Sequence, residues 1–393
     1  MRLLFLKVIN IHNFLGKICM KDIKEVINKG CFWLKNSGII NSSNDENLGG
    51  VRSWYDPDQD EYGFYYSEIT GYMISTLLYI NQYIDKDSKN IQLACSSKNW
   101  LIERMYDSDV SGFKCRHNND HNKLNNRICT FDNGMILSGL VELHKASNSD
   151  TLSEQIFGLD ALLSKNFLVD DNNIAEHRYL PHENNFESEK IGWSNQNGSF
   201  LIKSLKGLLS FYDLSENKNI KDLEKIFDKV VLMQSTNGQF ITDKYLNTTF
   251  LHPQCYTIEG LIVAYEYFNK ESYKNSIIKG LMWMLSLQNI NTGGFSHFVS
   301  EDIIDHNESV DINAQVLRIW IVALSKKWII EDNNIELLIK RIISYQNTNQ
   351  NDQKSFGGFR YGYSLQNEKI NHINCWGTMF SIQALDYADK YFN

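Results

Sequence analysis

Six segments of this chain are apolar nearly all round, rich in small residues and spaced about 60 residues apart. Apolar residues recur at i, i+3, i+4 and i+7, which is the pattern of an α-helix, and an apolar surface on every face indicates a buried helix. The six segments are 68–84, 132–145, 198–214, 256–268, 311–325 and 375–388. A helical unit that recurs at such a spacing favours a repeat architecture over separate domains.

Six amphipathic segments alternate with the apolar ones, and their charged faces predict helices half exposed to water. They are 21–35, 90–106, 152–167, 220–234, 273–288 and 335–346. Six hairpins of one outer and one inner helix predict an all-α fold, the (α/α)6 toroid. An open solenoid of the same hairpins is the alternative. It would need polar capping repeats, whereas the last inner helix is apolar, with Trp376, Met379, Phe380 and Leu385.

Superposing the six inner segments without gaps aligns one column in which five of the six residues are small. Its members are Thr76, Gly139, Gly207, Gly260, Arg318 and Ala384. Glycine inside a helix costs up to about 1 kcal/mol relative to alanine, so its recurrence predicts that neighbouring inner helices approach closely. The outer helices share an ending, a glutamine followed by a glycine turn and an aromatic residue, as in Gln234…Gly238-Gln239-Phe240, Gln288…Gly293-Gly294-Phe295 and Gln346…Gly357-Gly358-Phe359. Glycine there turns the chain, and the aromatic is predicted to fill the ring wall.

Composition excludes several classes of protein. With 42% hydrophobic and 22% charged residues the chain is predicted to be globular, and 39 basic against 47 acidic side chains give a net charge of −8, which does not attract nucleic acid. No stretch reaches the roughly 18 apolar residues of a membrane span. The seven cysteines are odd in number and scattered, which favours a reduced, cytoplasmic chain.

The toroid repeat predicts two parts, an N-terminal extension over 1–19 and a single toroid domain over 20–393. The first 17 residues are apolar enough to suggest a signal peptide as an alternative. Asn10, His12 and Asn13 interrupt that run, and no small-residue cleavage site follows it.

Several motifs carry a resemblance to a known superfamily: Thr-Phe-Asp-Asn-Gly-Met at 130–135, His-Pro-Gln-Cys-Tyr-Thr-Ile-Glu-Gly-Leu at 252–261, Asp-Ile-Asn-Ala-Gln at 311–315, and Gly-Gly-Phe at 357–359 with Asn-Cys-Trp-Gly-Thr-Met-Phe at 374–380. Over 20–390 the chain resembles the six-hairpin (α/α)6-toroid superfamily of carbohydrate-active proteins, including toroids of bacterial surface-polysaccharide biosynthesis. The resemblance implies an enzyme acting on an oligosaccharide or polysaccharide, of the glycoside hydrolase or the sugar or uronyl epimerase type. The Gly-Gly-Phe repeats are also similar to those of terpenoid-cyclase and prenyltransferase toroids, which lack a sugar substrate.

Loop lengths predict where a site lies. Connections from inner to outer helices are short, whereas those from outer to inner helices reach roughly 20 or 30 residues. The long loops therefore share one face with the N-termini of the inner helices, whose free N–H groups favour anionic ligands. We expect a funnel-shaped sugar site there.

Residue types near the inner-helix starts supply the candidates, because carboxylates, Tyr and His carry protons and aromatics stack on sugar rings. The catalytic candidates are Glu68, Asp132, Glu259, Asp311, Tyr256 and His252. The substrate-binding candidates are Tyr66, Arg178, Trp193, Asn195, Asn313, Arg360, His372 and Trp376. A non-catalytic, glycan-binding toroid remains an alternative. Asp132 and Asp311, placed at equivalent positions by the alignment, are equally suited to be helix N-caps.

No cofactor or metal is predicted. Cys and His are zinc ligands and come close in sequence at His252 with Cys255, His372 with Cys375, and Cys115 with His117, but the paired CxxC motif is absent. The acidic run 56–60 resembles the start of a calcium loop but lacks its glycine and glutamate. Buried thiols and solvated acids are the simpler interpretations.

Overall fold

The computed structural model describes residues 20–117, 126–147, 154–168, 178–180, 185–187, 194, 196–215, 220–300, 307–330 and 333–393. The predicted extension over 1–19 lies outside these residues. Within the described part of the chain, no helix combines the length and the hydropathy that crossing a membrane requires.

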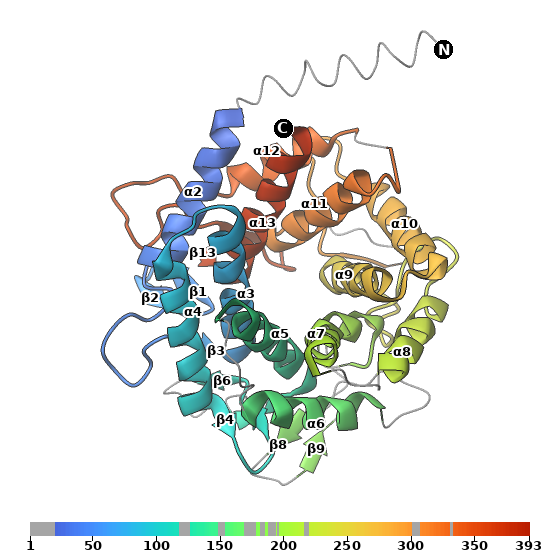
Figure 1. Cartoon of the computed structure of the whole chain (residues 1–393). Coiled ribbons are helices and arrows are strands. Elements are labelled where there is room, and N and C mark those ends of the chain that lie inside the picture. The colour runs from blue at the N-terminus through green and yellow to red at the C-terminus, as the bar shows by residue number, and fades with distance from the viewer. Residues whose placement is uncertain are drawn as a thin grey trace.

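Two concentric rings of helices confirm the predicted (α/α)6 toroid (Figure 1). The inner ring consists of α3 (Ser67–Tyr83), α5 (Thr130–Ser147), the 3₁₀ helix η4 (Ser199–Ser204) continuing into α7 (Leu205–Ser215), α9 (Leu251–Phe268), α11 (Val310–Ser325) and α13 (Cys375–Phe392). The outer ring consists of α2 (Met20–Asn36), α4 (Ser88–Trp100) with the π-helical turn η1 (Leu101–Met105), α6 (Glu154–Leu168), α8 (Ile220–Leu232), α10 (Glu271–Leu285) and α12 (Ile335–Ser344). Each predicted helix is present with ends shifted by a few residues, because periodicity places a helix better than its ends.

The strands of the described structure all lie in connections from outer to inner helices, on the face where the long loops were predicted. They are β1 (Trp54–Asp56), β2 (Glu61–Tyr62), β3 (Tyr65–Tyr66), β4 (Tyr106–Asp107), β5 (Gly112–Phe113), β6 (Arg116–His117), β7 (Ile128–Cys129), β8 (Arg178–Leu180), β9 (Asn185–Glu187), β10 (Thr249–Phe250), β11 (Phe298–Val299), β12 (Arg360–Tyr363) and β13 (Lys369–Asn374). Their sheets have the orders β12-β13-β1-β2, β7-β8-β9, β3-β6, β4-β5 and β10-β11. These short sheets hold the loops in place over the ring.

The ring is closed by contacts between the two ends of the chain, which rules out the open solenoid. Strand β1 pairs antiparallel with β13, so that Trp54 lies opposite Asn374. Helix α13 packs on both α2 and α3. On the outer ring, Gln346 Nε2 donates hydrogen bonds to the carbonyl oxygens of Val26 in α2 (2.8 Å) and Gly357 (2.9 Å).

The other repeated glutamines make the same bonds one and two hairpins earlier. Gln234 Nε2 donates to the carbonyl oxygens of Gly238 (2.9 Å) and Ser276 in α10 (3.0 Å). Gln288 Nε2 donates to those of Gly293 (2.8 Å) and Asn334 before α12 (3.3 Å). The glutamine therefore ties each turn to the next outer helix, a role that the spacing alone did not reveal.

The recurrent glycines lie where inner helices touch. A Cβ on Gly139 would lie 2.5 Å from the carbonyl oxygen of Gly71, and one on Gly207 would lie 2.6 Å from that of Gly134. Both distances are far below a van der Waals contact. The predicted close approach of α3, α5 and α7 is therefore confirmed.

The gap-free alignment was wrong by one residue at α11. Asp132 is the third residue of α5 but Asp311 is the second residue of α11, so the two aspartates are not equivalent. Asn133 and Asn313 are equivalent instead, because their Oδ1 atoms accept the backbone N–H of Phe113 (2.7 Å) and Phe295 (2.8 Å). The N-cap residue of α11 is Ser309, so the capping interpretation of Asp311 is wrong as well.

Candidate active site

A cavity of about 870 Å³ lies at the N-terminal ends of the inner helices, where the funnel was predicted. Seven of the candidates line it together: Tyr66, Glu68, Asp132, His252, Tyr256, Asp311 and Trp376. They come from helices α3, α5, α9, α11 and α13 or from residues directly before them. The toroid thus gathers residues more than 300 positions apart around one space.

His252 and Asp311 form a close pair on one side of this cavity. The His252 Nδ1 and Asp311 Oδ2 atoms are 2.7 Å apart, between the first turns of α9 and α11. Burial is the largest single influence and raises the pKa of Asp311, but the hydrogen bond and charge of His252, with smaller contributions from Ser309 and His297, together lower the pKa below its usual value. Because a carboxylate only accepts hydrogen bonds, Nδ1 donates to Asp311, so Nε2 is the ring nitrogen that can accept a proton.

Glu68 and Asp132 lie on the other side of the ring, on the first turns of α3 and α5. Burial, followed by the charge of Asp132, raises the pKa of Glu68 to about 8. The Tyr66 hydroxyl donates to Asp132 Oδ1 at 3.5 Å. A protonated carboxyl group at neutral pH is suited to donate a proton, as a general acid does.

Aromatic rings form part of the cavity wall. Tyr256 stacks on Phe131 with ring centroids 5.3 Å apart, and its ring also lies 4.4 Å from the His252 ring and 3.6 Å from Lys203 Nζ. Trp376 packs edge to face against Tyr66 at 5.8 Å. Burial raises the pKa of Tyr256, so its hydroxyl stays protonated. Rings beside proton-carrying groups suit a sugar, which has apolar ring faces and hydroxyl edges.

The sequence analysis missed several residues of the cavity wall. Arg116 begins β6, and its guanidinium lies 4.0 Å from the Phe64 ring centroid and 5.3 Å from that of Tyr66. Arg127, His297 and Tyr361 also line the cavity. All four lie in loops or strands, whereas most of the residues predicted from the sequence lie at the starts of the inner helices. The length of the connections from outer to inner helices predicts the face of the site, but it does not identify single residues on that face.

Glu259 lies apart from the other catalytic candidates, at a second cavity of about 810 Å³ that opens toward the C-terminal ends of the inner helices. Arg318 Nε donates to Glu259 Oε1 at 2.9 Å, and Lys203 Nζ lies 2.7 Å from Oε2. Burial raises the pKa of Glu259, but these two cations outweigh it and lower the pKa below its usual value. Neither Lys203 nor Arg318 was predicted to contact Glu259.

Three of the binding candidates do not line the funnel cavity. Asn313 is buried and holds the Phe295 N–H, as described above. His372 on β13 lies with Nε2 3.1 Å from Asp56 Oδ2 and stacks on Trp54 at 5.5 Å. Arg360 on β12 is half-buried and lies opposite Ile373.

Three further binding candidates cannot be placed as side chains. Trp193 and Asn195 lie outside the described residues. The backbone of Arg178 lies in β8, opposite Cys129, and its side chain is outside the described part.

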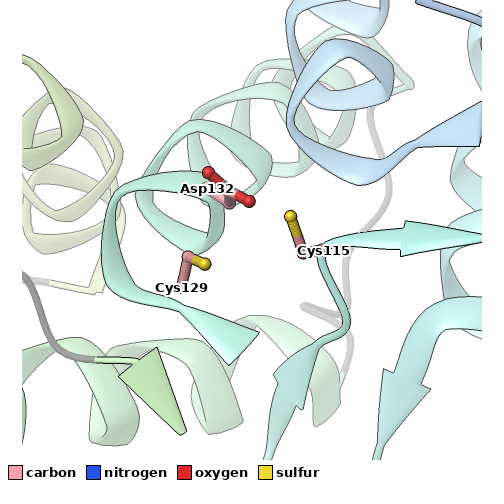
Figure 2. Close-up of side chains that lie close together, drawn as sticks. All are labelled: Cys115, Cys129 and Asp132. Atoms are coloured by element: carbon pink, nitrogen blue, oxygen red, sulfur yellow. The ribbon is translucent and has the colours of Figure 1, made fainter. Parts of the chain in front are cut away.

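In two of the three His and Cys combinations of the sequence analysis, the residues have other partners. His252 binds Asp311, Cys255 lies against Met284, and His372 binds Asp56. A different set converges among the described residues: Cys115, Cys129 and Asp132, whose ligand atoms all lie within 4.8 Å of one another (Figure 2).

No family model matches the sequence, and no curated protein matches it either. Solved structures match the fold over nearly the whole chain. Cellobiose 2-epimerase from Bacillus thermoamylovorans superposes with a TM-score of 0.73 at 12% identity, covering 94% of this chain and 99% of that one. A D-mannose isomerase superposes with a TM-score of 0.69 at 12% identity, covering 93% of this chain and 97% of that one. An unsaturated glucuronyl hydrolase specific for heparin superposes with a TM-score of 0.64 at 13% identity, covering 94% of this chain and 97% of that one. These proteins are six-hairpin toroids, so the predicted (α/α)6 toroid fold is confirmed.

Proposed function

We propose that this protein is an enzyme that moves protons on a reducing oligosaccharide, of the sugar epimerase or isomerase type. The observation that carries the proposal is the pair His252–Asp311, with Nδ1 and Oδ2 2.7 Å apart, on the wall of the funnel cavity. An imidazole oriented by a carboxylate is a typical general base. The similarity in fold to a cellobiose 2-epimerase and a D-mannose isomerase supports the same reaction class.

The chain's own residues account for the formation of an enediol in such a reaction, and the protonated His252 can then return the proton to the neighbouring carbon, which completes an isomerisation. His252 Nε2 removes the proton from the carbon beside the carbonyl group of the open-chain sugar. Glu68, on the opposite side of the ring, donates a proton to the oxygen that gains negative charge. Tyr256 and Trp376 flank the sugar ring, and Arg116 adds positive charge to the wall. This assignment leaves Glu259 out of the reaction, because Arg318 and Lys203 hold both of its oxygens.

Glycoside hydrolysis is the second candidate, and the pair Glu68 and Asp132 favours it. Hydrolysis needs one protonated and one ionised carboxyl group at the scissile bond. Glu68, whose pKa is raised to about 8, would be the acid and Asp132 the base. The similarity in fold to an unsaturated glucuronyl hydrolase supports this alternative.

Isotope exchange separates the candidates. Purified protein is incubated in D₂O with reducing disaccharides, neutral and uronic, and the products are followed by NMR. An epimerase or isomerase places deuterium on the carbon beside the carbonyl group and leaves the glycosidic bond intact. A hydrolase releases monosaccharides without that exchange. Binding with neither reaction would support a non-catalytic, glycan-binding toroid instead.

The substrate and setting of the protein are also part of the proposal. We propose that the substrate is an oligosaccharide or polysaccharide of a biosynthetic route. We also propose that the protein is cytoplasmic, because its cysteines are scattered and odd in number. A terpenoid substrate is disfavoured because the cavity wall carries four carboxylates and two arginines, Glu68, Asp132, Asp243, Asp311, Arg116 and Arg127.

A further inference from the structure

Two thiols and a carboxylate converge at the edge of the funnel cavity. The Sγ atoms of Cys115 and Cys129 and a carboxylate oxygen of Asp132 lie within 4.8 Å of one another, and all three residues are buried. Figure 2 shows the three side chains converging from two segments, Cys129 and Asp132 from the start of α5 and Cys115 from the loop beside it. Both cysteines are thiols and form no disulfide.

The backbone holds these side chains in place. The Cys115 N–H donates to the Arg127 carbonyl oxygen at 2.6 Å, and the Cys115 carbonyl oxygen accepts from the Ser67 N–H at 3.0 Å. Cys129 ends β7 directly before α5, and Asp132 lies in the first turn of that helix. The three ligands are therefore fixed to the start of α5 and to the loop that packs on it, which reduces the ordering cost of binding.

We propose that Cys115, Cys129 and Asp132 bind a divalent zinc-like cation. Zinc takes thiolate sulfur at about 2.3 Å and carboxylate oxygen at about 2.0–2.2 Å, so that ligand atoms of one site lie roughly 3.5–4 Å apart. Atoms already within 4.8 Å reach that geometry by small side-chain rotations. This set differs from the His and Cys combinations considered from the sequence, since Cys115 and Cys129 come together only through the folding of the loop between α4 and α5.

The composition of the set favours a soft metal with an open position. Thiolates select zinc over calcium or magnesium. Three protein ligands leave a fourth position for water or substrate, as in catalytic zinc sites. All three ligands line the cavity, so this position faces the space proposed for the sugar.

Charge around the set is balanced. Two thiolates and one carboxylate around a divalent cation leave one negative charge, and Arg116 follows Cys115 directly and lines the same cavity. A bound cation would occupy Asp132, which disfavours the hydrolytic alternative, in which Asp132 acts as a base.

Cobalt titration tests the site without relying on enzyme activity. The full chain is reduced, freed of metal with a chelator and titrated with Co²⁺, whose thiolate complexes absorb strongly in the near ultraviolet and whose tetrahedral complexes absorb in the visible. We expect one equivalent of Co²⁺ to bind with both bands, and one equivalent of Zn²⁺ to displace it. The absence of a thiolate band from the wild-type protein would overturn the proposal.

Matched variants locate the ligands. Cys115→Ser and Cys129→Ser should each weaken Co²⁺ binding at least tenfold and lower the thiolate band. Cys375→Ser is the control, because Cys375 is also a buried thiol at the start of an inner helix but lies outside the set. If a serine variant does not fold by circular dichroism, Asp132→Asn keeps both thiols and should still weaken binding.

Two results would contradict the assignment. One is unchanged Co²⁺ binding in both cysteine variants. The other is a Cys115–Cys129 disulfide, found by peptide mapping, in protein purified under reducing conditions. The titration measures metal affinity and not enzyme activity. A negative result would therefore overturn the metal site alone, and the isotope-exchange experiment would still test the proposed sugar chemistry.

Discussion

The two cavities at the opposite ends of the inner helices bury the same type of side chain with opposite consequences. At the funnel end, burial and the neighbouring Asp132 raise the pKa of Glu68 to about 8. At the other end, burial acts against Glu259 as well, but Arg318 and Lys203 lower its pKa below the usual value. Among the described residues Glu68 forms no ion pair, whereas Glu259 forms two.

This difference distinguishes a reactive carboxyl group from a structural one. Taking a charge out of water is costly unless a partner compensates it, and an uncompensated acid takes up a proton instead. Glu68 therefore keeps a proton that it can donate, while Glu259 stays ionised between two cations. Charge compensation, more than burial or residue type, assigns the roles at the two ends.

Removing the anion at the structural end should give the largest loss of stability. Glu259→Gln leaves Lys203 and Arg318 buried without a counterion, and we expect the free energy of unfolding to fall by about 3–5 kcal/mol. Urea denaturation measures this change in the free energy of unfolding. Glu266→Gln is the control, since Glu266 is half exposed on the same helix, 3.1 Å from Lys326, and should cost less than about 1 kcal/mol. Equal losses in the two variants would contradict the comparison.

Changes at the funnel end should instead affect turnover. We expect His252→Ala to lower the rate of solvent deuterium exchange about 10²–10⁴-fold, because it removes the proposed base. Asp311→Asn should also lower kcat, since it removes the charge that orients His252. The unfolding free energy should change little by comparison with Glu259→Gln. His144→Ala, at the far end of α5, serves as a control with wild-type rates. Exchange within tenfold of wild type in His252→Ala would refute the assigned base.

Glu68→Gln should separate stability from activity in the metal-free protein. The pKa of Glu68 is about 8 in the folded chain and near 4.5 when unfolded, so its contribution to stability is present below pH 4.5 and lost as the pH rises through 8. Glutamine does not ionise, so the variant should be more stable than wild type at pH 8, by about 1–3 kcal/mol, yet less active. Denaturation at pH 5 and pH 8 with a chelator measures this. A variant less stable at pH 8 would show that Glu68 is not buried as an acid.

Lys203→Met should have the smallest effect. Burial lowers the pKa of Lys203 to about 8, and Arg318 alone still pairs with Glu259 in the variant. An apolar side chain of similar length also keeps the packing against the Tyr256 ring, which Lys203 Nζ approaches to 3.6 Å. We expect a change in unfolding free energy within about 1 kcal/mol. A loss as large as that of Glu259→Gln would mean that both cations are required.

The sequence by itself determined the helices, their alternation, the closed ring and the face that carries the site. These features follow from periodicity and loop length, which are properties of neighbouring residues. The sequence also indicates how far each residue lies from the start of its helix. Glu68 is the second residue of α3, whereas Glu259 lies about 12 Å from the start of α9.

Only the tertiary structure decided which side chains meet. The one-residue shift at α11, the structural role of Asn313, the ion pairs of Glu259 and the approach of Cys115 to Cys129 all depend on contacts between segments distant in sequence. Periodicity specifies the face on which a side chain lies, but its partner and its charge state depend on how the hairpins pack around the ring.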